Sequence, residues 1–135
     1  MLQPKNTKFR KFQKSRVKGV QSNTDQLRYG KFGIKTVSAA RIPARTIEAV
    51  RRVITRKFKR LGIVWIRVFP DIAVSEKPAE VRMGKGKGAP QYWVCRVKRG
   101  AILFEFDGVS AQLAKQAARL ADSKLPVKTR FITYS

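Results

Sequence analysis

The strongest helical pattern in the chain lies between Pro43 and Gly62. Pro43 suits the first turn of a helix, and Gly62 suits the position after its last turn. Between them, apolar residues recur every three or four positions and fall on one stripe of a 3.6-residue helix: Ile47, Val50, Ile54, Phe58 and Leu61. The pattern therefore predicts a helix over about 44–61 with one face packed on a core.

A second helix is predicted near the C-terminus. Ser110 can cap its first turn, the helix runs through Lys124, and Pro126 ends it. Because small side chains let a helix lie close to a sheet, we expect tight packing here. The small and apolar residues of the predicted inner face are Leu113, Ala114, Ala117, Ala118, Leu120 and Ala121.

The remaining apolar runs predict strands. Gly30 and Gly33 interrupt the first run and suggest a bulge or a close backbone approach. Arg99–Gly100 separates two later runs and predicts a short hairpin. Residues 71–90 have no regular period and predict a long loop. The predicted strands are 28–37, 63–69, 91–98, 101–106 and 127–133.

This order of elements predicts an α+β fold. The simplest packing is a two-layer sandwich of a mostly antiparallel mixed sheet with two helices, plus a basic N-terminal extension and a long Gly-rich loop. A strand–helix–strand unit could add a parallel pair. The length of 135 residues suits one domain, which we place at residues 25–135, after an extension over residues 1–24.

The net charge narrows the choice of partner. The chain has 31 Lys and Arg against 8 Asp and Glu, for a net charge of +23, and 43% of its residues are hydrophobic, which is enough for a core. Self-repulsion at this charge destabilises a small domain unless an anion neutralises it. Basic residues are spread along most of the chain, and no apolar run reaches the roughly 20 residues of a membrane span, so we expect nucleic acid and no membrane.

The extension contains no acidic residue before Asp25. Two interpretations stay open: it is solvated without a partner, or it orders on a phosphate backbone while Phe9 and Phe12 stack on bases or pin it to the domain. The first 20 residues lack the apolar stretch of a secretory signal, so we expect them in the mature protein. Its candidate RNA-binding residues are Lys5, Lys8, Arg10, Lys11, Lys14, Arg16 and Lys18.

The helix at 44–61 should carry a basic face opposite its apolar stripe. Glu48 is its one acid and can pair with Arg52 at one-turn spacing, which leaves most of the positive charge unmatched. Such a face suits binding to a phosphate backbone. Contacts to phosphates fix the position of a protein on nucleic acid but do not select a base sequence. Arg51, Lys57 and Arg60 flank the apolar stripe. We expect RNA contacts from Arg45, Arg51, Arg52, Arg56 and Lys59.

The second candidate site is the Gly-rich part of the long loop. It lacks the residue spacing of a Walker A phosphate-binding loop. It is not a dinucleotide-binding fingerprint either, because it does not begin a helix after a strand. A flexible linker is the plain alternative, but about 20 residues without a period in a small domain usually indicate function or disorder. We predict an RNA-contacting loop made of Arg82, Met83, Gly84, Lys85, Gly86, Lys87 and Gly88.

Catalysis has little support. His is absent, and the single Cys95 is expected to be buried and inert. Glu105 and Asp107 could share a strand face, where each would be exposed or paired with a cation. We therefore predict no catalytic residue, metal, cofactor or small-molecule substrate. The aromatic side chains of the strand-like runs are expected in the core rather than on a base-stacking platform: Trp65, Phe69, Trp93, Phe104, Phe106 and Phe131.

Two other functions would also use this charge. An RNA chaperone needs only charge and flexibility, and it should dissociate from a large RNA–protein particle at moderate salt, whereas a structural component should remain. An enzyme acting on RNA would lose turnover when Asp107 and Glu105 are replaced. Neither alternative is excluded by composition alone.

Several strings in the chain resemble the large-subunit ribosomal protein sixteen family, whose eukaryotic counterpart is large-subunit protein ten. Residues 20–26 match poorly, so no contact is transferred to them. The matching segments follow the family's order over nearly the whole chain: residues 1–5 (MLQPK), 7–11, 44–45, 47–49, 51–52, 65–71 (WIRVFPD), 76–78, 81–88 (VRMGKGKG), 92–94, 107–109 and 124–129.

The resemblance implies a structural constituent of the large ribosomal subunit and not an enzyme. Such proteins bind large-subunit ribosomal RNA near the aminoacyl-tRNA site, touch other large-subunit proteins, and help organise tRNA positioning and late subunit assembly. The family's Gly-rich loop, matched by Arg82 to Gly88, points toward tRNA and the peptidyl transferase region. Residues 78–82 and 102–105 look closer to mitochondrial versions, so a ribosome in the mitochondrial matrix is favoured over the bacterial cytoplasm or a plastid.

Overall fold

The computed structural model describes residues 1–13, 15–22 and 26–134, and it confirms the α+β fold. The predicted boundary between extension and domain, at residues 24 and 25, lies outside the described residues. Along the described chain the elements are β1 (Phe32–Thr36), β2 (Ala40–Pro43), α1 (Ala44–Lys57), β3 (Ile63–Ile66), β4 (Ile72–Glu76), β5 (Ala89–Val97), β6 (Ile102–Asp107), α2 (Ala111–Lys124) and β7 (Thr129–Thr133).

The strands form two sheets, whereas the sequence predicted one mixed sheet. The four-stranded sheet has the order β3-β6-β1-β7, and the three-stranded sheet has the order β2-β5-β4. Every neighbouring pair is antiparallel, so the predicted parallel pair is absent among the described strands. The strands on either side of α1 do not pair, because β2 lies in one sheet and β3 in the other.

The predicted hairpin at Arg99–Gly100 is wrong, although the turn is present. The amide of Ala101 donates to the carbonyl of Lys98 at 3.1 Å, and the amide of Gly100 donates to the carbonyl of Thr36 at 3.0 Å. After this turn β5 and β6 enter different sheets. The local turn signal was therefore correct, but the partners of both strands come from elsewhere in the chain.

Two short strands were missed, and both lie at the edges of the three-stranded sheet. β2 ends at Pro43, which is tolerated because an edge strand leaves one side of its backbone unpaired. β4 lies inside the segment 71–90 that was predicted as loop, and it pairs with β5 through an irregularity between Val74 and Ser75. The true irregular segment is the shorter stretch between β4 and β5.

Helix α1 ends earlier than predicted. Ile47, Val50 and Ile54 are buried as expected, but Leu61 is 66% exposed and lies beyond the helix. Lys59 and Arg60 adopt positive φ angles of 52° and 63°, so the chain has already left the helix there. A Cβ at Gly62 would lie 2.4 Å from the carbonyl oxygen of Asp107, so this glycine lets the chain pass close to β6 rather than ending α1.

Helix α2 begins and ends as predicted. The Ser110 hydroxyl accepts a hydrogen bond from the amide of Leu113 at 3.3 Å, which is a standard N-cap. Leu120 is 43% exposed, so it lies outside the inner face that the sequence assigned to it. The residues that α2 buries are all alanines: Ala114, Ala117, Ala118 and Ala121.

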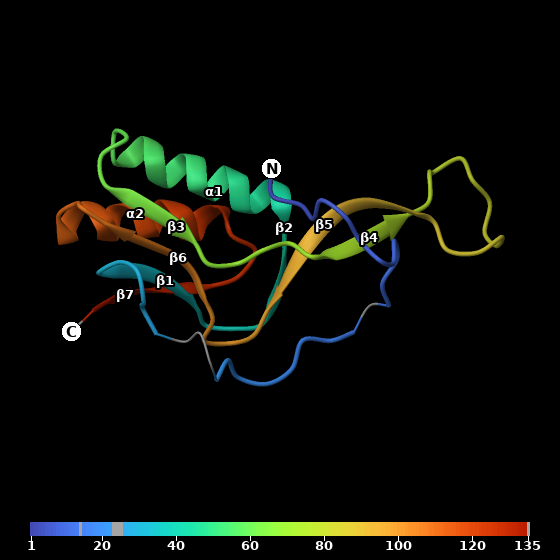
Figure 1. Cartoon of the computed structure of the whole chain (residues 1–135), viewed down its shortest axis with the longest axis horizontal. Helices are drawn as coiled ribbons and strands as arrows, with labels where there is room; N and C mark the ends of the chain where they lie inside the picture. Colours follow the sequence, from blue (N-terminus) through green and yellow to red (C-terminus); the bar gives the residue numbers. More distant parts are fainter. Residues whose placement is uncertain (14, 23–25, 135) are drawn as a thin grey trace.

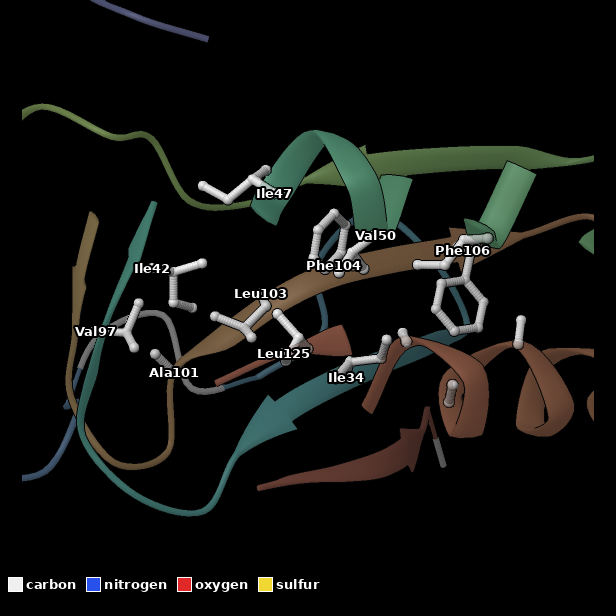
Figure 2. Packing of buried hydrophobic residues seen from close by; sticks show 14 of the residues in the cluster. Ile34, Ile42, Ile47, Val50, Val97, Ala101, Leu103, Phe104, Phe106 and Leu125 are labelled. Carbon is white, nitrogen blue, oxygen red and sulfur yellow. The ribbon is translucent and has the colours of Figure 1, made fainter. Parts of the chain in front are cut away.

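The core lies between the two helices and one face of the four-stranded sheet. Figure 2 shows Ile34, Phe104 and Phe106 of the sheet beneath Val50 of α1. Ile42 and Val97 bring the three-stranded sheet into the same cluster, so the two sheets share one core. Figure 1 shows the helices at one end of the molecule and the β4–β5 loop projecting from the other.

Candidate nucleic-acid interface

The outer face of α1 is basic, as the sequence predicted. Its apolar stripe enters the core, so the residues on the opposite side meet solvent. Arg45 also lies over the ring of Tyr92, with its guanidinium carbon 4.9 Å from the ring centroid. The exposed cations of this face are Arg45, Arg52 and Arg56, and Arg51 is partly exposed beside them. Lys59 is also exposed, but it lies beyond the end of the helix rather than on the predicted helical face.

Glu48 is shared between two of these arginines. Its carboxylate lies 2.5 Å from Nη2 of Arg51 and 3.2 Å from Nε of Arg52. The hydrogen bond from Arg51 is the main cause that lowers the pKa of Glu48 to about 2, against the opposing effect of partial burial. Arg56 and Lys59 have no ion pair with any described residue, so their charge remains available to an anion.

The extension lies over the three-stranded sheet instead of standing free. One face of that sheet carries Pro43, Val94 and Ile72 side by side, since these residues are register partners across β2, β5 and β4. Phe12 and Ser15 lie against this face and line with it a partly open pocket of about 150 Å³. Phe12 therefore pins the extension to the domain, while Phe9 is 66% exposed and does not.

Two arginines of the sheet hold the extension at one point. A guanidinium nitrogen of Arg41 donates to the carbonyl of Ser15, and one of Arg96 donates to its hydroxyl. Further along, Val20 forms an isolated bridge with Arg99. The described basic residues of the extension are exposed at Lys5, Lys8, Arg10, Lys11, Arg16 and Lys18, and Lys14 lies outside the described residues.

The Gly-rich loop projects from the end of the β4–β5 ribbon (Figure 1). Gly84, Lys85 and Gly86 follow one another with positive φ angles of 103°, 60° and 86°. A Cβ at Gly84 or Gly86 would meet nothing within 4 Å, so these glycines serve the backbone conformation. Gly88 differs, because a Cβ there would lie 2.5 Å from the carbonyl oxygen of Glu76.

The lysines at the loop have different surroundings. Lys77 donates to the carbonyl of Gly84, and Lys87 donates to the carbonyl of Phe12 in the extension. Lys11 returns the link by donating to the carbonyl of Lys87 at 3.0 Å. Lys85 makes no such bond with any described residue. The loop and the extension are therefore joined, and no pattern in the sequence indicated this link.

A buried charge pair was also missed as a structural feature. Glu105 and Arg67 are single charged residues in two apolar runs, and β3 pairs with β6 directly beside them. Oε2 of Glu105 accepts no hydrogen bond from a described residue but lies 2.8 Å from Nη1 of Arg67. Oε1 accepts from the amides of Arg28, Tyr29 and Gly30 at 2.8, 2.9 and 3.1 Å. This pair fixes the segment that leads from the extension into β1 on the four-stranded sheet.

The aromatic prediction holds for half of its residues, and the thiol prediction holds. Phe104 and Phe106 are fully buried and Phe131 packs on the core. Trp65 and Trp93 are only partly buried and lie outside the core cluster, and Phe69 is 46% exposed. Cys95 is buried, and that burial raises its pKa to about 11, so its reactive thiolate is scarce near neutral pH. Asp107 is partly exposed and accepts a hydrogen bond from the amide of Gly108 at 2.7 Å.

Membrane spans and metal clusters are both absent from the described part of the chain. Neither α1 nor α2 is long and apolar enough to cross a bilayer. Across residues 1–13, 15–22 and 26–134, no group of three or more Cys, Asp or Glu side chains is placed to hold a metal ion.

Comparison with known proteins gives a consistent result. Residues 4–132 match the model of the family described as ribosomal protein L16p/L10e. Large ribosomal subunit protein uL16m of Prototheca wickerhamii is 93% identical over 135 residues, which cover all of both chains. Large ribosomal subunit protein uL16 of Xanthobacter autotrophicus is 61% identical over 132 residues, or 98% of this chain and 96% of the relative. Its counterpart in Rhodopseudomonas palustris is 59% identical over the same length.

These matches span nearly the whole chain, including the extension, α1 and the Gly-rich loop. The relative at 93% identity is of the mitochondrial type. The resemblance seen in the sequence is thereby confirmed. The chain belongs to the ribosomal protein L16p/L10e family, a family of structural ribosomal proteins and not of enzymes.

Proposed function

We propose that this chain is a structural constituent of the large ribosomal subunit that binds large-subunit ribosomal RNA near the aminoacyl-tRNA site. It helps to position tRNA and to complete late subunit assembly, and it contacts other large-subunit proteins. The observation that carries this proposal is the full-length match to a protein named for the large ribosomal subunit. The charge of +23 supports it, because such a charge calls for an anionic partner.

Ribosomal RNA is assigned to the basic face of α1 and to the extension. Arg56 on α1 and Lys59 just beyond its end are the strongest candidates, since no described acid neutralises them. Arg51 and Arg52 share Glu48, so each contributes less net charge to a phosphate. The basic side chains of the extension stay exposed while its backbone is held on the three-stranded sheet, which suits contact with a phosphate backbone.

The Gly-rich loop is assigned to tRNA and the peptidyl transferase region. Met83 is fully exposed in this projecting loop. Arg82 and Lys85 are exposed and bond to no described residue, so they are assigned to phosphates. Lys87 has a different role, because it ties the loop to the extension and sets the direction of the loop.

The compartment we propose is the mitochondrial matrix. The support is the 93% identity to a mitochondrial-type relative, against 61% to a bacterial one. Fractionating the cells of origin tests this, with the bacterial cytoplasm and the plastid as the contrary outcomes. Mass spectrometry should find the chain in the large-subunit peak of mitochondrial ribosomes.

The roles of the two loop lysines can be separated in ribosomes that carry a variant as their only copy. We expect Lys85→Gln to weaken tRNA binding at the aminoacyl site, with an unchanged free energy of unfolding and a salt slope reduced by about 1. Lys87→Gln should also release the extension, seen as faster trypsin cleavage at Lys8 to Lys11 in the free protein.

The outcomes that contradict the proposal are concrete. A chain found free at the top of a sucrose gradient at moderate salt would not be a ribosomal constituent. Ribosomes with Lys85→Gln that bind tRNA as wild type does, at every salt concentration tested, would remove the loop from the proposed tRNA contact.

A further inference from the structure

Tyr29 is an exposed aromatic residue that is nevertheless held in place. Its side chain stacks on Trp65 with the ring centroids 6.1 Å apart and the planes at 24°. The guanidinium carbon of Arg67 lies 5.7 Å from the same ring. Even so, 56% of Tyr29 is exposed. Trp65 and Arg67 are two residues apart, so they support the ring from the same strand side and leave its remaining surface to solvent.

The backbone beneath this ring is fixed as well. The amide of Tyr29 donates to Oε1 of Glu105 at 2.9 Å, between the bonds from its two neighbours. A Cβ at Gly30 would lie 2.7 Å from the carbonyl oxygen of Phe106 and 2.9 Å from the ring of Trp65. The residue that follows Tyr29 is therefore pressed onto the sheet, and the Tyr29 ring loses little further freedom when a flat ligand stacks on it.

The charge around the ring favours a polyanion. Arg28 and Lys31 flank Tyr29 in sequence, and both are exposed. Among the described residues, the one carboxylate that bonds to this segment belongs to Glu105, which is fully buried and paired with Arg67, so it presents no negative charge to a ligand. A rigid aromatic face with cations beside it is the arrangement that single-stranded RNA-binding proteins use to stack a base and hold its phosphates.

We propose that Tyr29 is a stacking platform for an unpaired nucleobase of RNA, supported by Trp65 and flanked by Arg28 and Lys31. This inference rests on the proposed function and deepens it, because it adds a contact to bases where α1 and the loop provide contacts to phosphates. Stacking tolerates any base, so the platform adds affinity and register without reading sequence.

The test compares two probes of equal length and charge. One is a 12-nucleotide oligoadenylate, and the other is the same sugar–phosphate chain without bases. Wild-type protein should bind the oligoadenylate more tightly, and Tyr29→Ala should reduce the ratio of the two affinities by about five- to hundredfold. Tyr29→Phe should keep the ratio. The salt slope should stay the same in all three proteins, because no phosphate contact changes.

Two further variants keep the test decisive. Tyr29→Leu retains an apolar contact with Trp65 but no aromatic face, so it should behave like Tyr29→Ala if stacking is the cause. Tyr134→Ala removes a tyrosine that is 72% exposed and has no ring partner among the described residues, and it should leave the ratio unchanged. Glu105 accepts from backbone amides, and side-chain substitutions at Tyr29 do not remove these donors. All variants should therefore keep the fold, which circular dichroism checks.

An unchanged ratio in Tyr29→Ala, or an equal loss in Tyr134→Ala, would overturn the platform. If wild type binds both probes equally and with a steep salt dependence, stacking fails while the proposed RNA binding stands. If wild type binds neither probe, the proposed function fails with it.

Discussion

The two sheets of this protein handle charge in opposite ways. The four-stranded sheet buries Glu105 and matches it with Arg67 and three backbone amides. On the three-stranded sheet, Arg41 and Arg96 bond instead to the carbonyl and hydroxyl of Ser15, which are neutral. The ion pairs between described residues all lie in α1 or the four-stranded sheet.

The half with the four-stranded sheet pairs its buried charge internally, whereas the half with the three-stranded sheet leaves positive charge unpaired. A cation on a neutral acceptor keeps its full charge, so the three-stranded sheet, the extension and the loop carry an excess of positive charge to the surface. The four-stranded sheet and the helices supply most of the shared hydrophobic core. One half therefore provides most of the stability, and the other adds the unpaired positive charge of the extension and the loop to that of the outer face of α1.

The largest effect should come from breaking the buried pair. Glu105→Gln keeps the size of the side chain but leaves the guanidinium of Arg67, 8% exposed, without its counter-charge. We expect a loss of about 3–5 kcal/mol in the free energy of unfolding, because an uncompensated buried charge is costly. Urea denaturation at neutral pH measures it.

The matched control is Asp107→Asn, on the same strand but partly exposed and not in an ion pair with any described residue. It should cost less than about 1 kcal/mol. The double variant Glu105→Gln with Arg67→Met should recover much of the loss, because the glutamine oxygen at position 105 still accepts from the three amides and no unpaired charge stays buried. If Glu105→Gln unfolds at the same urea concentration as wild type, the buried pair is not what stabilises this half.

A smaller and more local effect is expected on the three-stranded side. Phe12→Ala removes the ring that pins the extension over the pocket. The free energy that holds the extension on the three-stranded sheet should fall by about 1 kcal/mol, because this side chain is only half-buried. The extension should open more often, so trypsin should cleave it about fivefold faster while global unfolding stays unchanged. Phe9→Ala, at an exposed position, is the control. Equal cleavage of the two variants would show that Phe12 does not pin the extension.

The sequence predicted the features that depend on residues close together along the chain, and it missed features that depend on distant residues. The Ser110 cap acts over three residues and the inner stripe of α1 over about two turns, so both were readable. The end of α1 was misplaced because the pattern extended to Leu61, while the backbone turns at Lys59. The pairing of β5 with β2, which lies before α1 and far from it in sequence, left no local signal.

The same division between local and long-range interactions applies to the candidate site. Periodicity alone placed the cations of α1 on the outer face, where the structure has them. The Gly-rich loop was visible from composition, but the link from Lys87 to Phe12 spans 75 positions and could not be inferred. Arg67 and Glu105 did carry a signal, since a lone charge of each sign in two apolar runs indicates that the two strands meet.

The smallest effect concerns α1, where Glu48 forms ion pairs with two arginines of the proposed RNA-binding face. The hydrogen bond from Arg51 lowers the pKa of Glu48 from 4.5 to about 2, so the unfolded chain binds more protons in that interval. Glu48 therefore stabilises the fold above about pH 4.5, and this contribution disappears as the pH falls toward 2. The contribution should be below about 1 kcal/mol, because both arginines are more than a third exposed.

Urea midpoints from about pH 2 to 6 should show Glu48→Gln below wild type at the upper end of this range and equal to it at the lower end. Glu76→Gln removes an exposed carboxylate of β4 that has no ion pair with a described residue, so it controls for the loss of one negative charge. A wild-type advantage that persists at the lowest pH would contradict the assignment to Glu48. A loss at Glu48 much smaller than at Glu105 would mean that the buried stripe of α1, and not its outer ion pairs, stabilises this helix.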